Sequence, residues 1–162
     1  MKKIGILIFL SVSFILHISC NKSPACKGDD KNNGMIEKYY RMHDFPMCVE
    51  AFVNENGTMV IRSGDELSAI TDSNCINYPE AGYSNEPPQI DFSEYSLLGF
   101  WTTGGGCNIR FIREVSRDDT NNKYLYEIRV NECGSCEMLR YDANFVLVPR
   151  LPDGYTVDFI VF

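Results

Sequence analysis

The sequence predicts a mainly β domain with a minor α component: a small antiparallel sandwich or open barrel with one short helix. Most segments after residue 47 are β-prone and alternate apolar with polar residues, which is the period of a half-buried strand. Turns rich in Asn, Asp and Gly separate these segments at short intervals. Only one segment carries a helix start signal. We therefore expect six or seven short antiparallel strands, with no internal repeat.

A β-hairpin is predicted first. Residues 48–53 (CVEAFV) and 57–62 (GTMVIR) are both apolar-rich and β-prone. Asn56 and Gly57 lie at their junction, and an Asn-Gly pair favours the tight turns that match the twist of two paired strands.

A short helix is predicted over residues 65–70. Ser63 and Glu66 are three residues apart and form a capping box, in which side chains satisfy free backbone N–H groups at the helix start. Residues 71–89 then contain Asn, Pro and Gly with little periodicity, which predicts a long loop pinned by Cys75.

The second half of the chain is denser in predicted strands, namely residues 95–102, 107–115, 124–130, 145–149 and 155–162. Alternation in the third of these gives one face that carries Tyr124, Tyr126, Ile128 and Val130. The polar residues 116–123 predict a turn centred near Thr120, which joins the second and third strands. Pro152-Asp153-Gly154 predicts another turn, which folds the last two strands into a final hairpin.

The N-terminus has the layout of a bacterial lipoprotein signal. Lys2 and Lys3 precede an apolar stretch, residues 4–16, which is too short to cross about 30 Å of hydrocarbon. Ser19, a small residue, stands directly before Cys20. This junction predicts acylation of the Cys20 thiol with more than one fatty-acid chain, such as palmitate, which is what stable membrane attachment needs.

The predicted processing defines the domain organisation. Residues 1–19 are the signal peptide, residues 20–35 a flexible polar tether, and residues 36–162 a single β-rich domain. The alternative is ordinary signal cleavage near Ser23-Pro24-Ala25, which would remove Cys20.

Charge and histidine content exclude several function classes. The formal charge of −7 becomes −9 once the two signal lysines are removed, which argues against nucleic acid as a ligand. Of two histidines, His17 leaves with the signal and only His43 remains. A histidine-based nucleophile or a histidine-rich metal site is therefore not expected, and we predict a non-enzymatic protein without a cofactor or metal ion.

Cysteine content predicts disulfides in an exported domain. Besides Cys20, six cysteines remain, an even number that allows up to three bridges: Cys26, Cys48, Cys75, Cys107, Cys133 and Cys136. The hairpin predicted around Thr120 places Cys107 opposite residues 132–133, so Cys107 is expected to bond to either Cys133 or Cys136.

Two further interpretations of these cysteines stay open. Cys133-Gly134-Ser135-Cys136 has the spacing of a thiol–disulfide oxidoreductase motif, but it follows a strand and precedes no helical pattern. Zinc bound by Cys107, Cys133 and Cys136 would need a fourth ligand and reduced thiols. A structural disulfide or turn clasp is the favoured reading.

A glycine-rich segment is the candidate binding loop, and its residues are Thr102, Thr103, Gly104, Gly105 and Gly106. It is not a phosphate-binding loop, because it lacks Gly-Lys-Ser/Thr and a strand follows it. Exposed loops on a rigid scaffold often carry binding. The alternative is a bulge or tight turn between two strands.

Short motifs in the last part of the chain resemble a known family. Residues 88–93 (PQIDFS), 97–99 (LLG) and 103–105 (TGG) follow one another, and an amphipathic hairpin, a cysteine-containing turn and residues 145–149 (FVLVP) come after them. This order over residues 87–162 is similar to the C-terminal domain of the PrcB-like protease-complex lipoproteins. In that family a P-x-(I/V)-D-F strand start and a T-G-G-Y loop recur.

The lipoprotein signal and the Asp/Asn-rich tether also look like those of Bacteroidetes-type lipoproteins, and this likeness implies anchoring to the outer membrane on its periplasmic or surface face. The resemblance to the PrcB-like family implies a non-enzymatic accessory that associates with a secreted protease. We thus predict a membrane-anchored, extracytoplasmic protein-binding module that uses the glycine-rich loop or an exposed strand edge, with a secreted protease or another envelope protein as partner. The alternatives are a thiol–disulfide redox protein using Cys133 and Cys136, or a purely structural envelope lipoprotein.

Overall fold

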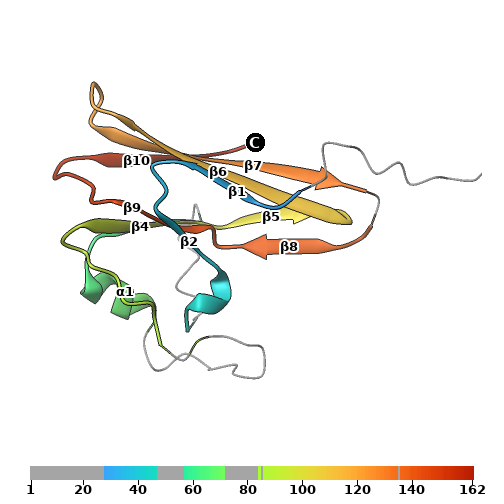
Figure 1. Cartoon of the computed structure of the whole chain (residues 1–162), viewed down its shortest axis with the longest axis horizontal. Helices are drawn as coiled ribbons and strands as arrows, with labels where there is room; N and C mark the ends of the chain where they lie inside the picture. The colour runs from blue at the N-terminus through green and yellow to red at the C-terminus, as the bar shows by residue number, and fades with distance from the viewer. Residues whose placement is uncertain (1–27, 47–56, 72–83, 85, 135) are drawn as a thin grey trace, which may run out of the picture.

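A computed structural model of the chain describes residues 28–46, 57–71, 84, 86–134 and 136–162. The described residues are mainly β, with one α-helix, as the sequence predicts. Their strands form open sheets rather than a closed barrel (Figure 1). No helix in this described portion has the length and apolar character needed to cross a membrane.

Two four-stranded sheets form the body of the fold. Sheet A has the order β1-β6-β7-β10 and consists of β1 (Lys31–Gly34), β6 (Asn108–Asp118), β7 (Lys123–Cys133) and β10 (Thr156–Val161). Sheet B has the order β2-β9-β4-β3 and consists of β2 (Lys38–Tyr40), β9 (Phe145–Pro149), β4 (Tyr95–Phe100) and β3 (Thr58–Ile61).

Sheet A is built on the predicted hairpin of β6 and β7, in which Asn108 pairs with Cys133 and Asp118 with Lys123. The two edge strands, β1 and β10, run parallel to their neighbours, so this sheet is mixed, whereas the sequence predicted antiparallel strands. Sheet B is antiparallel throughout.

A smaller two-stranded sheet, β5 (Thr102–Gly105) with β8 (Leu139–Asp142), continues sheet B. Leu98 pairs with Val146 in the β4–β9 ladder, and Thr102 pairs with Asp142 in the β5–β8 ladder, four residues further along both strands. The two ladders therefore share one register. They are interrupted at Trp101 on one side and at Ala143–Asn144 on the other.

The apolar core has two parts, because sheet B is buried on both faces. Between the sheets lie Leu98, Phe100, Phe111, Val115, Tyr124, Tyr126, Ile128, Val146, Val148 and Leu151. The opposite face of sheet B packs against the helix and the segment after β2, through Tyr40, Phe45, Ile61, Leu67, Leu97, Ala143, Phe145 and Leu147. Double burial explains why residues 145–148 are continuously apolar instead of alternating.

The helices cover the outer face of sheet B. The predicted helix is confirmed as α1 (Gly64–Ile70), with Ser63 Oγ accepting a hydrogen bond from the Glu66 N–H at 3.2 Å. The Glu66 carboxylate in turn accepts from the Arg62 N–H at 2.6 Å. A 3-10 helix, η2 (Met42–Asp44), follows β2.

The predicted final hairpin is wrong. β9 belongs to sheet B and β10 to sheet A, so the turn at residues 152–154 carries the chain from one layer to the other. Hydrogen bonds fix this crossing to the start of β4: the Arg150 N–H donates to the Glu94 carbonyl at 2.8 Å, and the Leu151 N–H to Ser96 Oγ at 3.1 Å.

The predicted tether also needs correction. Lys31–Gly34 of the expected 20–35 segment forms strand β1, which pairs with β6. The first predicted strand, residues 48–53, lies outside the described residues, as does most of the predicted loop 71–89.

Candidate functional site

A fully buried arginine lies between the two sheets. Arg113 of β6 donates from Nε to Asn144 Oδ1 at 2.7 Å and from Nη2 to Asp142 Oδ2 at 3.0 Å. Its guanidinium carbon is 4.0 Å from the ring centroid of Tyr39, a stacked cation–π arrangement. Arg113 thus connects sheet A to the corner where β8 becomes β9.

Asn144 fixes that corner. Its backbone has a φ of 44°, a left-handed conformation that asparagine tolerates better than most residues. Its side-chain amide donates to the Phe100 carbonyl at 2.8 Å and to Thr102 Oγ1 at 2.7 Å, while its N–H donates to Asp142 Oδ1 at 2.8 Å. These bonds satisfy the backbone where the continuous ladder is interrupted.

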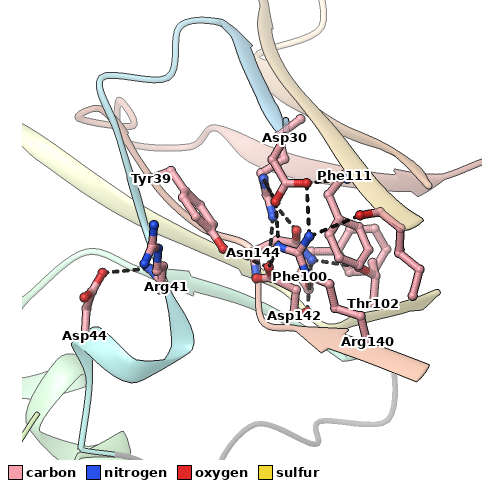
Figure 2. A network of polar contacts seen from close by, with 12 residues as sticks. Asp30, Tyr39, Arg41, Asp44, Phe100, Thr102, Phe111, Arg140, Asp142 and Asn144 are labelled. Atoms are coloured by element: carbon pink, nitrogen blue, oxygen red, sulfur yellow. Dashed lines mark hydrogen bonds and ion pairs between the residues drawn. The ribbon is translucent and has the colours of Figure 1, made fainter. Parts of the chain in front are cut away.

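Asp30 attaches the segment before β1 to the same cluster (Figure 2). Its carboxylate accepts hydrogen bonds from Arg140 Nη2 at 2.6 Å and from the Phe111 N–H at 2.9 Å, and it lies 3.5 Å from Arg113 Nη1. Burial raises the pKa of Asp30, but these bonds and the two guanidinium charges outweigh it, so its pKa is lowered. The carboxylate is therefore ionised at neutral pH.

The charges of the cluster balance one another. Arg113 and Arg140 are ion-paired with Asp30 and Asp142. The Tyr39 hydroxyl donates to Asp142 Oδ2 at 2.8 Å. Burial is the main cause that raises the pKa of Tyr39, and the negative charge of Asp142 adds to it. A neutral, hydrogen-bonded Tyr39 between balanced charges is a structural arrangement, not a poised acid–base pair.

A cavity of about 560 Å³ opens above this cluster, between the 28–32 segment, β2 with η2, and β8. Tyr39, Arg41 and His43 line it from one side, and Arg140, Tyr141 and Asp142 from the other. Asp29, Arg110 and Ile109 complete much of its wall. The cavity thus lies along the side of β8 that faces away from β5.

That side of β8 carries no paired strand within the described ranges. β2 covers the equivalent side of β9, where Tyr40 pairs with Phe145, and then the chain turns into η2 instead of continuing along β8. The Gly106 N–H donates to the Met138 carbonyl at 2.9 Å. Gly106 and Met138 therefore form a hydrogen-bonded pair, and such pairs alternate with non-hydrogen-bonded pairs along an antiparallel ladder. Leu139 and Tyr141 fall in the non-hydrogen-bonded pairs, so their backbone N–H and C=O groups point away from β5.

Large apolar side chains are exposed on this strand and just before it. Met138 is 60 % exposed, Leu139 62 % and Tyr141 52 %. The Trp101 ring lies beside Tyr141, with 6.2 Å between centroids. In contrast, the charged β8 side chains Arg140 and Asp142 turn inward to the polar cluster.

The glycine-rich segment predicted as a binding loop is strand β5. Thr102, Gly104 and Gly106 are buried, Gly105 is partly buried and Thr103 is exposed. A Cβ on Gly104 would lie 2.6 Å from Ile109 Cγ2 and 2.8 Å from Val130 Cγ1, so this glycine permits β5 to pack on sheet A. The segment supports β8 instead of forming a loop of its own.

The structure selects one of the two pairings that the sequence left open: Cys107 is bonded to Cys136, with a Cα–Cα distance of 4.8 Å. Cys133 is also disulfide-bonded, so the two cysteines of the redox-spaced motif are not bonded to each other. Zinc binding by these three thiols is incompatible with this oxidised state. The other cysteines of interest, Cys20, Cys26, Cys48 and Cys75, lie outside the described residues.

Sequence reasoning missed the polar cluster and the β8 edge. Arg113 occupies an inward position between Phe111 and Val115 in the alternating β6 pattern, which was the available signal for its burial. The open edge had no comparable signal, because residues 139–142 are a short and mixed segment.

Comparison with known proteins finds no relative. No family model matches the chain, and neither a curated protein nor a solved structure matches it. The functional assignment therefore depends on the geometry of the site.

Proposed function

We propose that this chain is a lipid-anchored extracytoplasmic protein that binds an extended segment of a partner protein along the outer edge of β8. The observation that carries the proposal is the combination of outward backbone groups and exposed apolar side chains at Leu139 and Tyr141. Strand addition uses both features: main-chain hydrogen bonds give affinity, and alternate side chains give specificity.

The composition of β8 favours such an addition. Natural edge strands are usually protected by proline, by outward charges or by a covering segment. β8 contains no proline, and both of its charged side chains turn toward the buried cluster. The face of β8 that carries Leu139 and Tyr141 is therefore apolar, and exposed apolar patches typically mark interaction surfaces.

Cys20 and the disulfide support the proposed extracytoplasmic location. Acylation of Cys20 would tether the domain to the outer membrane, and the Cys107–Cys136 bridge suits an oxidising compartment. The resemblance to PrcB-like lipoproteins suggests a secreted protease as the partner, and another envelope protein is the alternative.

Site-specific photo-crosslinking in native envelopes tests this function. Benzoylphenylalanine replaces Leu139 in the full chain, and we expect one discrete adduct whose crosslinked peptide comes from an extended segment of a single partner. Ile160, an exposed residue on the β10 edge, is the matched control position and should give no such adduct.

A second variant shows whether the adduct depends on the edge itself. Tyr141→Lys places an outward charge on β8 and should abolish the crosslink at Leu139, because edge lysines oppose strand addition. Tyr141 is exposed, so the variant should remain folded. An adduct of equal yield in Tyr141→Lys, or no adduct at Leu139, would contradict the proposed site.

A further inference from the structure

We infer that the segment received by β8 is an amphipathic strand: its residues opposite Leu139 and Tyr141 are apolar, and the residue between them has a neutral side chain that forms hydrogen bonds, such as glutamine. This inference rests on the proposed strand addition and names the chemistry of the partner segment. It follows from the different surroundings of the two faces of β8.

The pairing rules of strands connect each residue of the segment to one of these faces. Directly opposed residues in paired strands have their side chains on the same face, and successive side chains point to opposite faces. Residues of the segment that lie opposite Leu139 and Tyr141 therefore share their face. The residue between them lies opposite Arg140 and shares the face of Arg140 and Asp142.

The face that carries Leu139 and Tyr141 is apolar. Both side chains are more than half exposed, so a neighbouring strand would remove apolar area from water. Trp101 lies beside Tyr141, and Trp101 and Met42 both pack against the apolar cluster on the outer face of sheet B. Met42 also lines the cavity, as Tyr141 does. Apolar side chains at these two positions of the segment therefore gain burial.

The opposite face of β8 is polar and borders the 560 Å³ cavity. Arg140 and Asp142 turn to the side of Asp30 and Tyr39 (Figure 2), and Asn32 lines the cavity with these four residues. An apolar side chain opposite Arg140 would separate these groups from water without replacing any hydrogen bond, which is unfavourable. The residue that enters the cavity should therefore donate and accept hydrogen bonds.

The charges around the cavity favour a neutral side chain. The arginines and aspartates of the polar cluster are ion-paired with one another. Of the other arginine and aspartate side chains that line the cavity, Arg41 and Arg110 are positive and Asp29 is negative. Asp44 adds a second negative charge next to Arg41, because its carboxylate accepts a hydrogen bond from the Arg41 N–H at 2.7 Å. A charged side chain would thus lose hydration without a net attraction.

Four peptides with blocked ends test the inference with the full chain. They have the form acetyl-Thr-Ile-X-Val-Thr-amide, where X is Gln, Leu, Lys or Glu. The pattern of polar and apolar residues is the same in both directions, so the comparison does not depend on strand direction. Binding is followed by NMR through the amides of Leu139 and Tyr141. We expect the Gln peptide to bind about fivefold more tightly than the other three, because unpaired polar groups in a covered site are costly.

A fifth peptide tests the alternation. Acetyl-Ile-Val-Gln-Thr-Thr-amide has the composition of the Gln peptide, but its two apolar residues are adjacent and cannot lie on one face. We expect it to bind about tenfold more weakly, because one apolar side chain loses its burial beside Leu139 or Tyr141.

Asp29→Lys tests the charge balance of the cavity. Asp29 is exposed, so the variant should remain folded, and the substitution makes the cavity more positive by two charges. The Glu peptide should then bind more tightly than the Gln peptide, and the difference should shrink at high salt. Glu114→Lys is the matched control: it makes the same charge change at an exposed position of β6 outside the cavity lining and should keep the preference for Gln.

The outcomes separate the inference from the proposed function. If all five peptides shift the Leu139 and Tyr141 amides with equal affinity, strand addition stands and the inference is overturned. Tighter binding of the Leu, Lys or Glu peptide than of the Gln peptide by the wild type would also overturn it, as would an unchanged preference for Gln in Asp29→Lys. If no peptide perturbs these amides, the proposed function fails, and the inference fails with it.

Discussion

At the scale of single residues, Arg113 determines how the two sheets meet. It is fully buried, yet its polar partners come from distant parts of the sequence: Asp30 from before β1, Asp142 from the end of β8, and Asn144 from the corner that follows. Removing one member of a buried charge cluster leaves the others without compensation, which destabilises more than the intact pair stabilises.

Arg113→Met should therefore lower the free energy of unfolding by about 3–5 kcal/mol, because the Asp142 carboxylate loses its main buried counter-charge. Urea denaturation measures this loss. Arg117→Met on the same strand is the control, since Arg117 pairs with Asp119 at the surface and its removal should leave stability nearly unchanged. Equal effects from both variants would contradict a structural role for the buried cluster.

The sequence indicates that Arg113 faces inward, because it stands between Phe111 and Val115 in an alternating strand. Its partners could not be predicted, since local patterns carry no information on which residues 29 to 83 positions away will meet it. The same holds for the corner at Asn144, whose left-handed backbone depends on bonds to Phe100 and Thr102.

At the scale of elements, alternation and turn residues predicted the β6–β7 hairpin, a capping box predicted helix α1, and the structure confirms both. The sequence did not predict which sheet the last strands join, because β9 lies in sheet B and β10 in sheet A. The turn at residues 152–154 looks the same in sequence whether it closes a hairpin or crosses between layers. β1 was missed because Lys31–Gly34 has no apolar side chain and is held by backbone pairing and Asp30.

The glycines of β5 give an element-scale prediction. Gly104→Ala should destabilise the domain by about 1–3 kcal/mol, because the new methyl group overlaps Ile109 and Val130 and cannot be accommodated without moving sheet A. Gly105→Ala is the matched control, since its nearest neighbours are at 3.8 Å and the change should be neutral or slightly stabilising. Thermal unfolding of both variants compares them, and equal stability of the two would show that β5 does not pack as described.

At the scale of the whole molecule, Asp30 and β1 connect the N-terminal segment to the domain. This connection places residues 30–34 at the edge of β6, next to the polar cluster and the cavity. The domain boundary is consequently earlier than the sequence suggested, and part of the expected tether belongs to sheet A.

The lowered pKa of Asp30 predicts acid sensitivity of this attachment. A carboxyl group whose pKa is lowered on folding contributes stability above its unfolded pKa, near 4, and loses that contribution as the pH falls through its folded pKa. The difference in unfolding free energy between wild type and Asp30→Asn should thus be constant from about pH 5 to 7 and shrink below about pH 4. A difference that does not change with pH would contradict the ionised state of Asp30.

The most direct test of the central claim, an open edge on β8, is amide hydrogen exchange of the isolated full chain by NMR. The N–H groups of Arg140 and Asp142 face β5 and should exchange slowly, whereas those of Leu139 and Tyr141 face outward and should exchange rapidly. This alternation within one four-residue strand would show that the edge is free to receive a partner. Slow exchange at Leu139 and Tyr141 without any partner would mean that the edge is already covered, and it would contradict the proposed function.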